Sequence, residues 1–143
     1  MAPFVLEDRV RTGIKEIDTA HERLLTGLES LVAAVRHDCA QKHVTEFLSL
    51  LEFLVSEHFN DEECAMRRTG YPALLTHIIQ HQSLTTSFHT LAGEYKKHGY
   101  NKKFVIRLGN FMSIWMSDHM YKYDLHMAHW LQDAEQNQLH HEA

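Results

Sequence analysis

Two pairs of residues in the sequence have a spacing that places both side chains on one face of a helix. His58 and Glu62 lie in SEHFNDEECAM, and His77 and His81 lie in THIIQH. In an α-helix, residues four apart leave the same face about one turn apart, so one metal ion or a metal pair can take both side chains. Taken singly, such a pair is more often solvated surface than a metal site. Two pairs in succession favour a metal site.

Histidine is unusually frequent in this chain. The sequence contains 13 histidines, almost as many as the 14 lysines and arginines together. Surface solvation alone seldom calls for so many imidazoles, whereas imidazole is a common ligand for iron, zinc and other metals. Metal ligation is therefore the first function that the composition suggests.

The remaining composition predicts one globular domain. Of the 143 residues, 44% are hydrophobic and 23% are charged, and the net charge is -5 with basic residues scattered along the chain. This pattern argues against nucleic-acid binding. No apolar run is long enough to span a membrane, and MAPFVLEDRVRTG does not resemble a secretory signal. Cys39 and Cys64 lack a CxxC spacing, which fits a reducing compartment, so we expect a soluble cytoplasmic protein.

Breaker residues divide the chain into four long helical segments. Each segment repeats apolar residues at helical spacing, for example Leu24, Leu28 and Leu31 in the first. The first predicted helix begins near Asp18 or Thr19 and ends around DCAQ, and the second covers 43–68 and stops at TGYP. The third runs from about Pro72 to a C-terminal cap at Gly99. The fourth follows Asn101 and extends to 123, and a further helical piece covers 125–136.

Four amphipathic helices with short connections, and no strand pattern, predict an all-α protein with an up-down-up-down four-helix bundle. We expect a single domain over 1–143. It would consist of an N-terminal arm (1–17), the bundle (18–125), and a short C-terminal helical extension with a tail (126–143).

Further candidates for the metal site are His21 in the first predicted helix and His119 in the fourth. In an antiparallel bundle, a shared site lies at one height on all helices, so the turn between two ligands should fall midway between them in sequence. These midpoints fall in HDCAQ for His21 and His58, in RTGYP for Glu62 and His77, and in HGYN for His81 and His119. Since all three are predicted turns, the candidates should meet at one end of the bundle.

The number of ligands suggests more than one metal ion. Five imidazoles and one or two carboxylates exceed the needs of one four-coordinate zinc, while two six-coordinate ions that share bridging carboxylates would use about that many. A carboxylate has two oxygens, whereas a neutral imidazole offers one lone pair to one metal. Glu62 is therefore predicted to bridge.

Five segments, GIKEIDTAH, EHFNDEECAM, GYP, HIIQH and WMSDHMYKYD, resemble the successive signature segments of the hemerythrin family, bacterial single-domain type. The resemblance extends from about Phe4 to Asp124. It implies a di-iron centre with an oxo or hydroxo bridge. In that centre His77, His81 and His119 hold one iron, His21 and His58 hold the other, and Glu62 and Asp124 bridge the two.

Asp124 is assigned by the resemblance and not by periodicity. It follows His119 by five residues, which is about 140° around an ideal helix, and Tyr123 or His126 would share the face of His119 better. The assignment therefore requires a long reach or a local distortion. The chain also departs from the family at Ala20 and Leu6, where Gln and Trp are usual, which bears on solvent access and arm packing.

The resemblance implies reversible dioxygen binding, for storage or delivery inside a bacterial cell. Bundle di-iron oxidases typically have Glu-rich ligand sets, whereas imidazoles dominate here, so we expect a binding protein with no catalytic residues. An apolar oxygen pocket would exclude water. Its predicted residues, which are otherwise ordinary bundle core, are Leu24, Phe59, Trp115, Met116 and Met120.

The sequence leaves three alternatives open. The centre could sense oxygen or redox state and signal to a partner protein, or it could be a di-iron enzyme that acts on peroxide or nitric oxide. The chain could also be a metal-free helical bundle. Near the site, Asp61 or Glu63 could hydrogen-bond a ligand imidazole. Cys64 could be a redox-active thiol or, more commonly, a small buried apolar residue.

Overall fold

The computed structural model describes residues 11–37 and 40–142, apart from the side chains of 138–142. These residues form six α-helices and two π-helical turns. The elements are α1 (Lys15–Val35), α2 (Ala40–Phe53), η2 (Leu54–His58), α3 (Phe59–Thr69), α4 (Leu74–His98), α5 (Lys102–His119), η3 (Met120–Asp124) and α6 (Leu125–Glu142).

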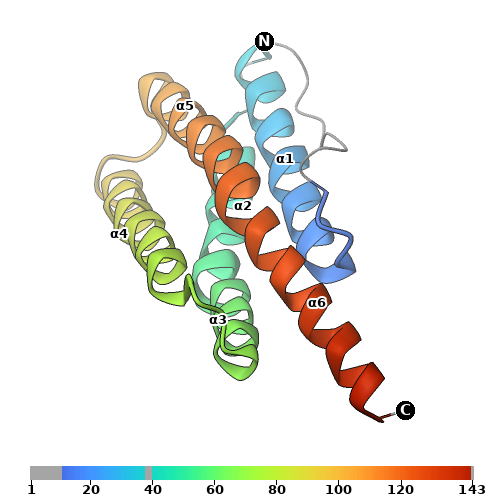
Figure 1. Ribbon diagram of the computed structural model, residues 1–143. Helices are drawn as coiled ribbons and strands as arrows, with labels where there is room; N and C mark the ends of the chain where they lie inside the picture. Colours follow the sequence, from blue (N-terminus) through green and yellow to red (C-terminus); the bar gives the residue numbers. More distant parts are fainter. Residues whose placement is uncertain (1–10, 38–39, 143) are drawn as a thin grey trace.

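The two π-helical turns join their neighbours without a break, so the eight elements make four helical rods. The rods are α1, α2–η2–α3, α4 and α5–η3–α6. α1 packs against α2 and α5, while α4 packs against α3 and α5. The predicted all-α helical bundle is confirmed. The expected further helical piece exists as α6, which continues α5 in one long rod (Figure 1). Within the described part of the chain, no helix is long and apolar enough to cross a membrane.

Three of the predicted helix ends are confirmed, each by local backbone chemistry. Gly70 and Gly99 have positive φ angles of 69° and 74° and end α3 and α4, because glycine reaches this region without a steric penalty. Asn101 precedes α5, and its side chain accepts hydrogen bonds from the amides of Lys103 and Phe104.

Two helices begin within a few residues of their predicted starts. α1 begins at Lys15 and not at Asp18 or Thr19. The Asp18 carboxylate instead accepts hydrogen bonds from the backbone amides of Thr12 (2.9 Å) and Gly13 (3.1 Å). These bonds hold the preceding segment against the first turn, so the helix extends further toward the N-terminus. α4 begins at Leu74, after a turn that contains Pro72.

Buried apolar residues form two separate clusters along the bundle. The larger one includes Leu28, Leu51 and Leu108 and occupies most of its length. The smaller one is built around Ile17, Met66 and Met127, with four partly buried neighbours, Ile14, Tyr71, Leu74 and Leu131. The polar residues that the sequence marks as metal ligands lie between the two clusters. They are therefore near one end of the bundle, as predicted, but closed off from that end by the smaller cluster.

The π-helical turns keep the buried face of each long rod pointing inward. In α2 and α3 the buried positions follow steps of three or four residues, except from Leu54 to Phe59, where the step is five. His119 and Asp124 are likewise five residues apart across η3, with the buried Met120 between them. A five-residue step on a straight α-helix would rotate the second side chain by about 140° away from the first. A π-helical turn accommodates the extra residue, so both faces stay buried.

Candidate metal centre

Five of the predicted ligands meet in one buried cluster. Each contributes one ligand atom, and these atoms all lie within 4.8 Å of one another. The residues are Glu62, His77, His81, His119 and Asp124. All five side chains are buried, although each is polar or charged. Burial of this kind costs free energy unless the groups are paired or bind a metal.

His21 and His58 join this cluster from the first two rods. The Nε2 atom of His21 lies 2.8 Å from Oδ2 of Asp124. The Nε2 atom of His58 lies 3.2 Å from Oε2 of Glu62. The structure therefore brings together all seven side chains that the sequence and the family resemblance indicated.

The two carboxylates divide the imidazoles into two groups. Glu62 Oε1 faces His81 Nε2 (3.1 Å) and His77 Nε2 (3.7 Å), and Asp124 Oδ1 faces His119 Nε2 (2.9 Å) and His77 Nε2 (3.2 Å). The second oxygen of each carboxylate faces His58 or His21 instead. Each carboxylate thus directs one oxygen to a group of three histidines and the other to a group of two. This is the arrangement needed to bridge two metal ions.

Asp124 reaches the cluster through local distortion of the helix. It is the last residue of η3, and the π-helical turn brings it to the face of His119. The apolar pattern of the sequence gives no signal for such a turn at η2, because Val55 and Phe59 keep a step of four. The step of five, from Leu54 to Phe59, becomes visible only in the burial of the side chains.

Unpaired polar atoms test whether the cluster fits a metal. Among the described residues, all but one of the buried side-chain nitrogens and oxygens without a hydrogen-bond partner belong to these seven side chains. The exception is Nε1 of Trp115. Buried polar groups in proteins are normally hydrogen-bonded, and the unpaired Nε2 atoms and carboxylate oxygens face one another here, so a shared metal would satisfy them. Imidazole nitrogens with carboxylate oxygens are a suitable donor set for iron.

The electrostatics of the cluster keep both carboxylates ionised. Burial would raise the pKa of Glu62 and of Asp124, but the surrounding imidazoles outweigh burial and hold each pKa well below its ordinary value. Burial would lower the pKa of His77, yet the carboxylates of Asp124 and Glu62 raise it to about 9. The pKa of His58 is also raised, because Glu62 outweighs burial. A cation is therefore favoured at this point.

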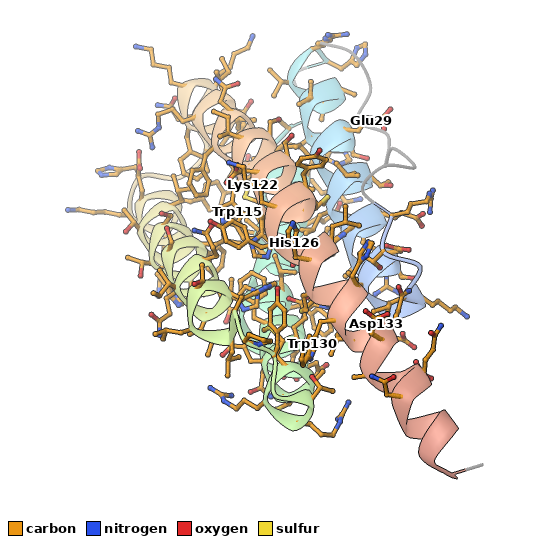
Figure 2. All side chains as sticks on the ribbon, viewed as in Figure 1. Glu29, Trp115, Lys122, His126, Trp130 and Asp133 are labelled. Atoms are coloured by element: carbon orange, nitrogen blue, oxygen red, sulfur yellow. The ribbon has the colours of Figure 1, made fainter. Side chains whose placement is uncertain are left out.

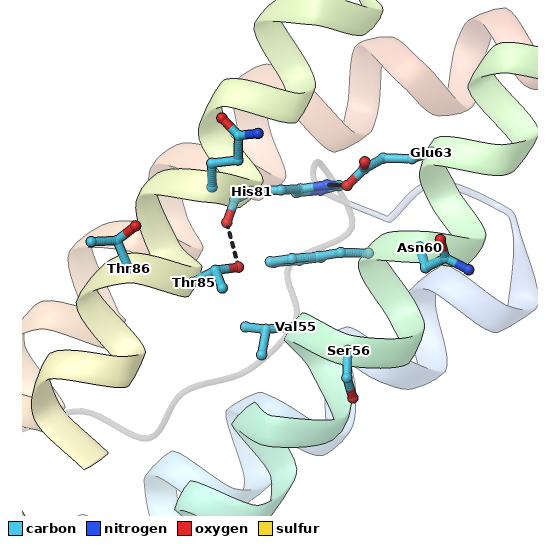
Figure 3. A pocket seen from close by; sticks show the side chains of 9 residues that line it. Val55, Ser56, Asn60, Glu63, His81, Thr85 and Thr86 are labelled. Atoms are coloured by element: carbon cyan, nitrogen blue, oxygen red, sulfur yellow. Dashed lines mark hydrogen bonds and ion pairs between the residues drawn. The ribbon is translucent and has the colours of Figure 1, made fainter. Parts of the chain in front are cut away.

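His81 is held from outside the cluster by two neighbours on η2–α3. Its Nδ1 atom lies 2.8 Å from Oε2 of Glu63, and its ring stacks on Phe59 with 3.7 Å between centroids and 4° between planes. Figure 3 shows His81 and Glu63 meeting across the gap between their helices. A carboxylate that binds the second nitrogen of a ligand imidazole fixes its tautomer and orientation. The prediction that Glu63 could do this is confirmed, whereas Asp61 is exposed.

The predicted oxygen-pocket residues surround the cluster on the side of the larger core. Leu24, Phe59, Met116 and Met120 are buried in that core, and the partly buried Trp115 packs against it. Trp115 also stacks on the His119 ring, with 4.3 Å between centroids. These positions give the cluster an apolar wall, and their role as an oxygen pocket stays a prediction.

The structure corrects the expectation for Cys64, since this residue is exposed and is not a small buried apolar side chain. Its position within the turn of α3 directs it away from the cluster that contains Glu62. Cys39 and Leu6 lie outside the described residues. Trp130, beyond the cluster on α6, points toward the end of α3, where its Nε1 donates a hydrogen bond to Thr69 Oγ1 (Figure 2).

A helical bundle that gathers imidazoles and carboxylates from all four rods defines a class of cation-binding proteins. The sequence profile of the Hemerythrin HHE cation binding domain matches residues 12–131, and the chain belongs to the hemerythrin family. It is similar to Bacteriohemerythrin of Clostridium acetobutylicum, with 27% identity over 126 residues. That alignment covers 85% of this chain and 95% of the relative. The family resemblance in the sequence is therefore confirmed.

Proposed function

We propose that the cluster holds two iron ions. His77, His81 and His119 would bind one iron, His21 and His58 would bind the other, and Glu62 and Asp124 would bridge them. The observation that carries this proposal is the division of carboxylate oxygens between the two histidine groups. An oxo or hydroxo group derived from solvent would complete the bridge. Membership of a cation-binding family supports the same assignment.

We further propose that the centre binds dioxygen reversibly, for storage or delivery. Two ferrous ions, when bound, would supply the electrons that dioxygen takes. The iron that His21 and His58 would hold has fewer protein ligands, so it would offer the open position. The chain's own part is to hold this position in a dry environment, because water and stray proton donors would convert the bound state into oxidised iron. Leu24, Phe59, Met116 and Met120, each at most 4% exposed, supply that wall.

The ligand set favours binding over oxidation chemistry. Imidazoles outnumber carboxylates five to two in the cluster. Glu-rich bundle sites provide more anionic oxygen, which stabilises high oxidation states of iron. We therefore assign no catalytic residue.

Sensing is the second candidate function, and one structural connection favours it. Asp124 ends η3, and α6 continues directly from it. α6 contacts distant parts of the chain, since Gln132 Nε2 donates to the Thr12 carbonyl and Trp130 donates to Thr69. A change at Asp124 could therefore reach the surface along one helix.

Iron analysis combined with spectroscopy tests the proposal. The protein should bind two iron ions per chain, and its visible spectrum should change and recover over repeated cycles of deoxygenation and re-aeration. Rapid and irreversible conversion to the ferric form would instead favour sensing or an enzyme acting on peroxide or nitric oxide. A colourless protein without iron would identify a metal-free bundle.

A further inference from the structure

A pocket opens between α1 and the rod formed by α2, η2 and α3. Its volume is about 370 Å³. The side of α1 contributes Lys15, Glu16, Thr19, Ala20, Arg23 and Leu24. The opposite side contributes Leu50, Phe53, Leu54, His58 and Asp61. The pocket therefore joins the protein surface to a residue of the metal cluster.

His58 is the cluster residue that this pocket reaches. Its side chain is 11% exposed, whereas the side chains of the other six cluster residues are 1–4% exposed. Its Nε2 atom is nonetheless buried and faces Glu62. One part of the ring thus faces the pocket, while Nε2 faces Glu62. The pocket therefore reaches the group of two histidines through His58.

The walls of the pocket suit a small neutral molecule. Leu24, Leu50 and Leu54 make its inner surface apolar. Its exposed rim carries two cationic side chains, Lys15 and Arg23, and two anionic ones, Glu16 and Asp61. Because these charges balance, the rim provides no net attraction for an anion. An apolar gas loses little on leaving water for such a surface, whereas a hydrated ion would lose its water.

A second pocket, of about 480 Å³, reaches a different residue of the cluster, His81. It lies between η2–α3 and α4, and its lining includes Asn60, Thr85 and Thr86 (Figure 3). At its inner end the His81 ring is covered by Phe59, and the outer nitrogen of that ring is bound by Glu63. A small molecule that enters here meets the His81 ring, which has one face covered by Phe59 and its outer nitrogen bound by Glu63.

We infer that the pocket between α1 and α2–α3 is the route by which dioxygen reaches the iron held by His21 and His58, and that Ala20 sets the width of this route. The inference rests on the proposed function. Ala20 precedes His21 directly and contributes one methyl group to the pocket wall. A longer side chain at this position would extend into the space next to His58.

A residue that controls passage has a distinctive kinetic effect. Narrowing the route raises the same barrier for entry and for escape, while the free and bound states keep their energies. Association and dissociation rates then fall by the same factor, and the equilibrium affinity stays constant. A residue that touches bound dioxygen would change the affinity instead.

Ala20→Leu tests this inference in the iron-loaded protein, with Ala33→Leu as the matched control. Ala33 lies on the same helix and faces solvent. Flash photolysis or stopped-flow mixing should show both dioxygen rates reduced about tenfold in Ala20→Leu, which corresponds to a barrier increase of about 1.4 kcal/mol. Affinity should change less than twofold, and Ala33→Leu should match the parent protein. Ala20→Val provides a smaller obstruction with an effect in the same direction.

A second measurement uses the full chain without iron. Xenon is an apolar probe of cavities, and under xenon pressure it should shift the methyl resonances of Leu24, Leu50 and Leu54 in the parent protein. These shifts should be lost in Ala20→Leu and retained in Ala33→Leu. Parental xenon shifts in Ala20→Leu, dioxygen rates equal to those of the control, or a change in only one rate would overturn the inference. Failure of the parent protein to bind iron or dioxygen would instead refute the proposed function.

Discussion

His119 Nε2 and Asp124 Oδ1 lie 2.9 Å apart, although five residues separate them in sequence. On a straight α-helix these side chains would diverge by about 140°. The π-helical turn of Met120–Asp124 removes that difference, and it does so next to the candidate metal site. Such turns are rare and frequently occur at functional sites. This turn determines which residue can act as the second carboxylate.

Moving the carboxylate by one residue tests the role of this turn. Asp124→Ala should reduce bound iron from two per chain to one or fewer, because a proposed bridge is lost. Adding Tyr123→Asp to that variant should not restore iron, since position 123 lies beside the His119 ring, whereas only position 124 places a carboxylate between His119 Nε2 and His21 Nε2. Iron analysis and visible spectra provide the measurement. Asp118→Ala is the control, because Asp118 is exposed on the same rod and pairs with Lys122. Recovery of iron in the double variant would contradict the prediction.

The contact between Glu63 and His81 predicts a graded loss of metal affinity. Glu63→Ala should weaken iron binding by about 10-fold to 100-fold, because the ligand imidazole loses the partner that orients it. Glu63→Gln should lose less, since the amide oxygen can still accept from Nδ1 of His81. Competition with a chelator of known affinity measures both effects. Glu57→Ala, an exposed change on the same rod, should leave the affinity unchanged. Equal losses in the Ala and Gln variants would show that charge and not orientation is decisive.

Removing the metal should destabilise the protein without unfolding it. The larger apolar core extends well beyond the cluster, through Leu28, Leu51 and Leu108, and should keep the helices packed. Binding to the native state alone adds about 4 kcal/mol when free metal exceeds its dissociation constant about a thousandfold. Calorimetry should therefore show a lower melting temperature after chelation, while far-UV circular dichroism stays helical. A random-coil spectrum after chelation would show that the bundle needs the metal to fold.

Two glycines should respond to alanine with opposite signs. Gly70 has a φ of 69°, and a Cβ there would meet no atom within 4 Å, so Gly70→Ala should cost about 1 kcal/mol through backbone strain alone. Gly93 lies inside α4, also with open space around it, and Gly93→Ala should add about 0.5–1 kcal/mol. Urea denaturation of the two variants measures both changes. Destabilisation by Gly93→Ala would indicate that this helix is constrained in a way the contacts do not explain.

Local chemistry explains the features that could be predicted from the sequence. Gly70, Gly99 and Asn101 act on backbone groups within a few residues, so their positions alone predict the ends of α3 and α4 and the start of α5. The spacing of His77 and His81 places them on one face by helix geometry. The turns midway between candidate ligands then predict that these residues meet. The whole cluster, apart from Asp124, follows from such local rules combined with antiparallel packing.

Asp124, the orientation of His81 and the pocket beside Ala20 depended on the tertiary structure. A helix adopts a π-helical turn at Met120–Asp124 because both its flanking segments have apolar faces to bury, and that requirement comes from the neighbouring rods. Glu63 and His81 are 18 residues apart, and their contact exists because α3 and α4 pack side by side. Spacing along one helix determines which side chains share a face. The distance between helices determines what those side chains touch. That distance results from the packing of the whole bundle, which spacing along one helix does not determine.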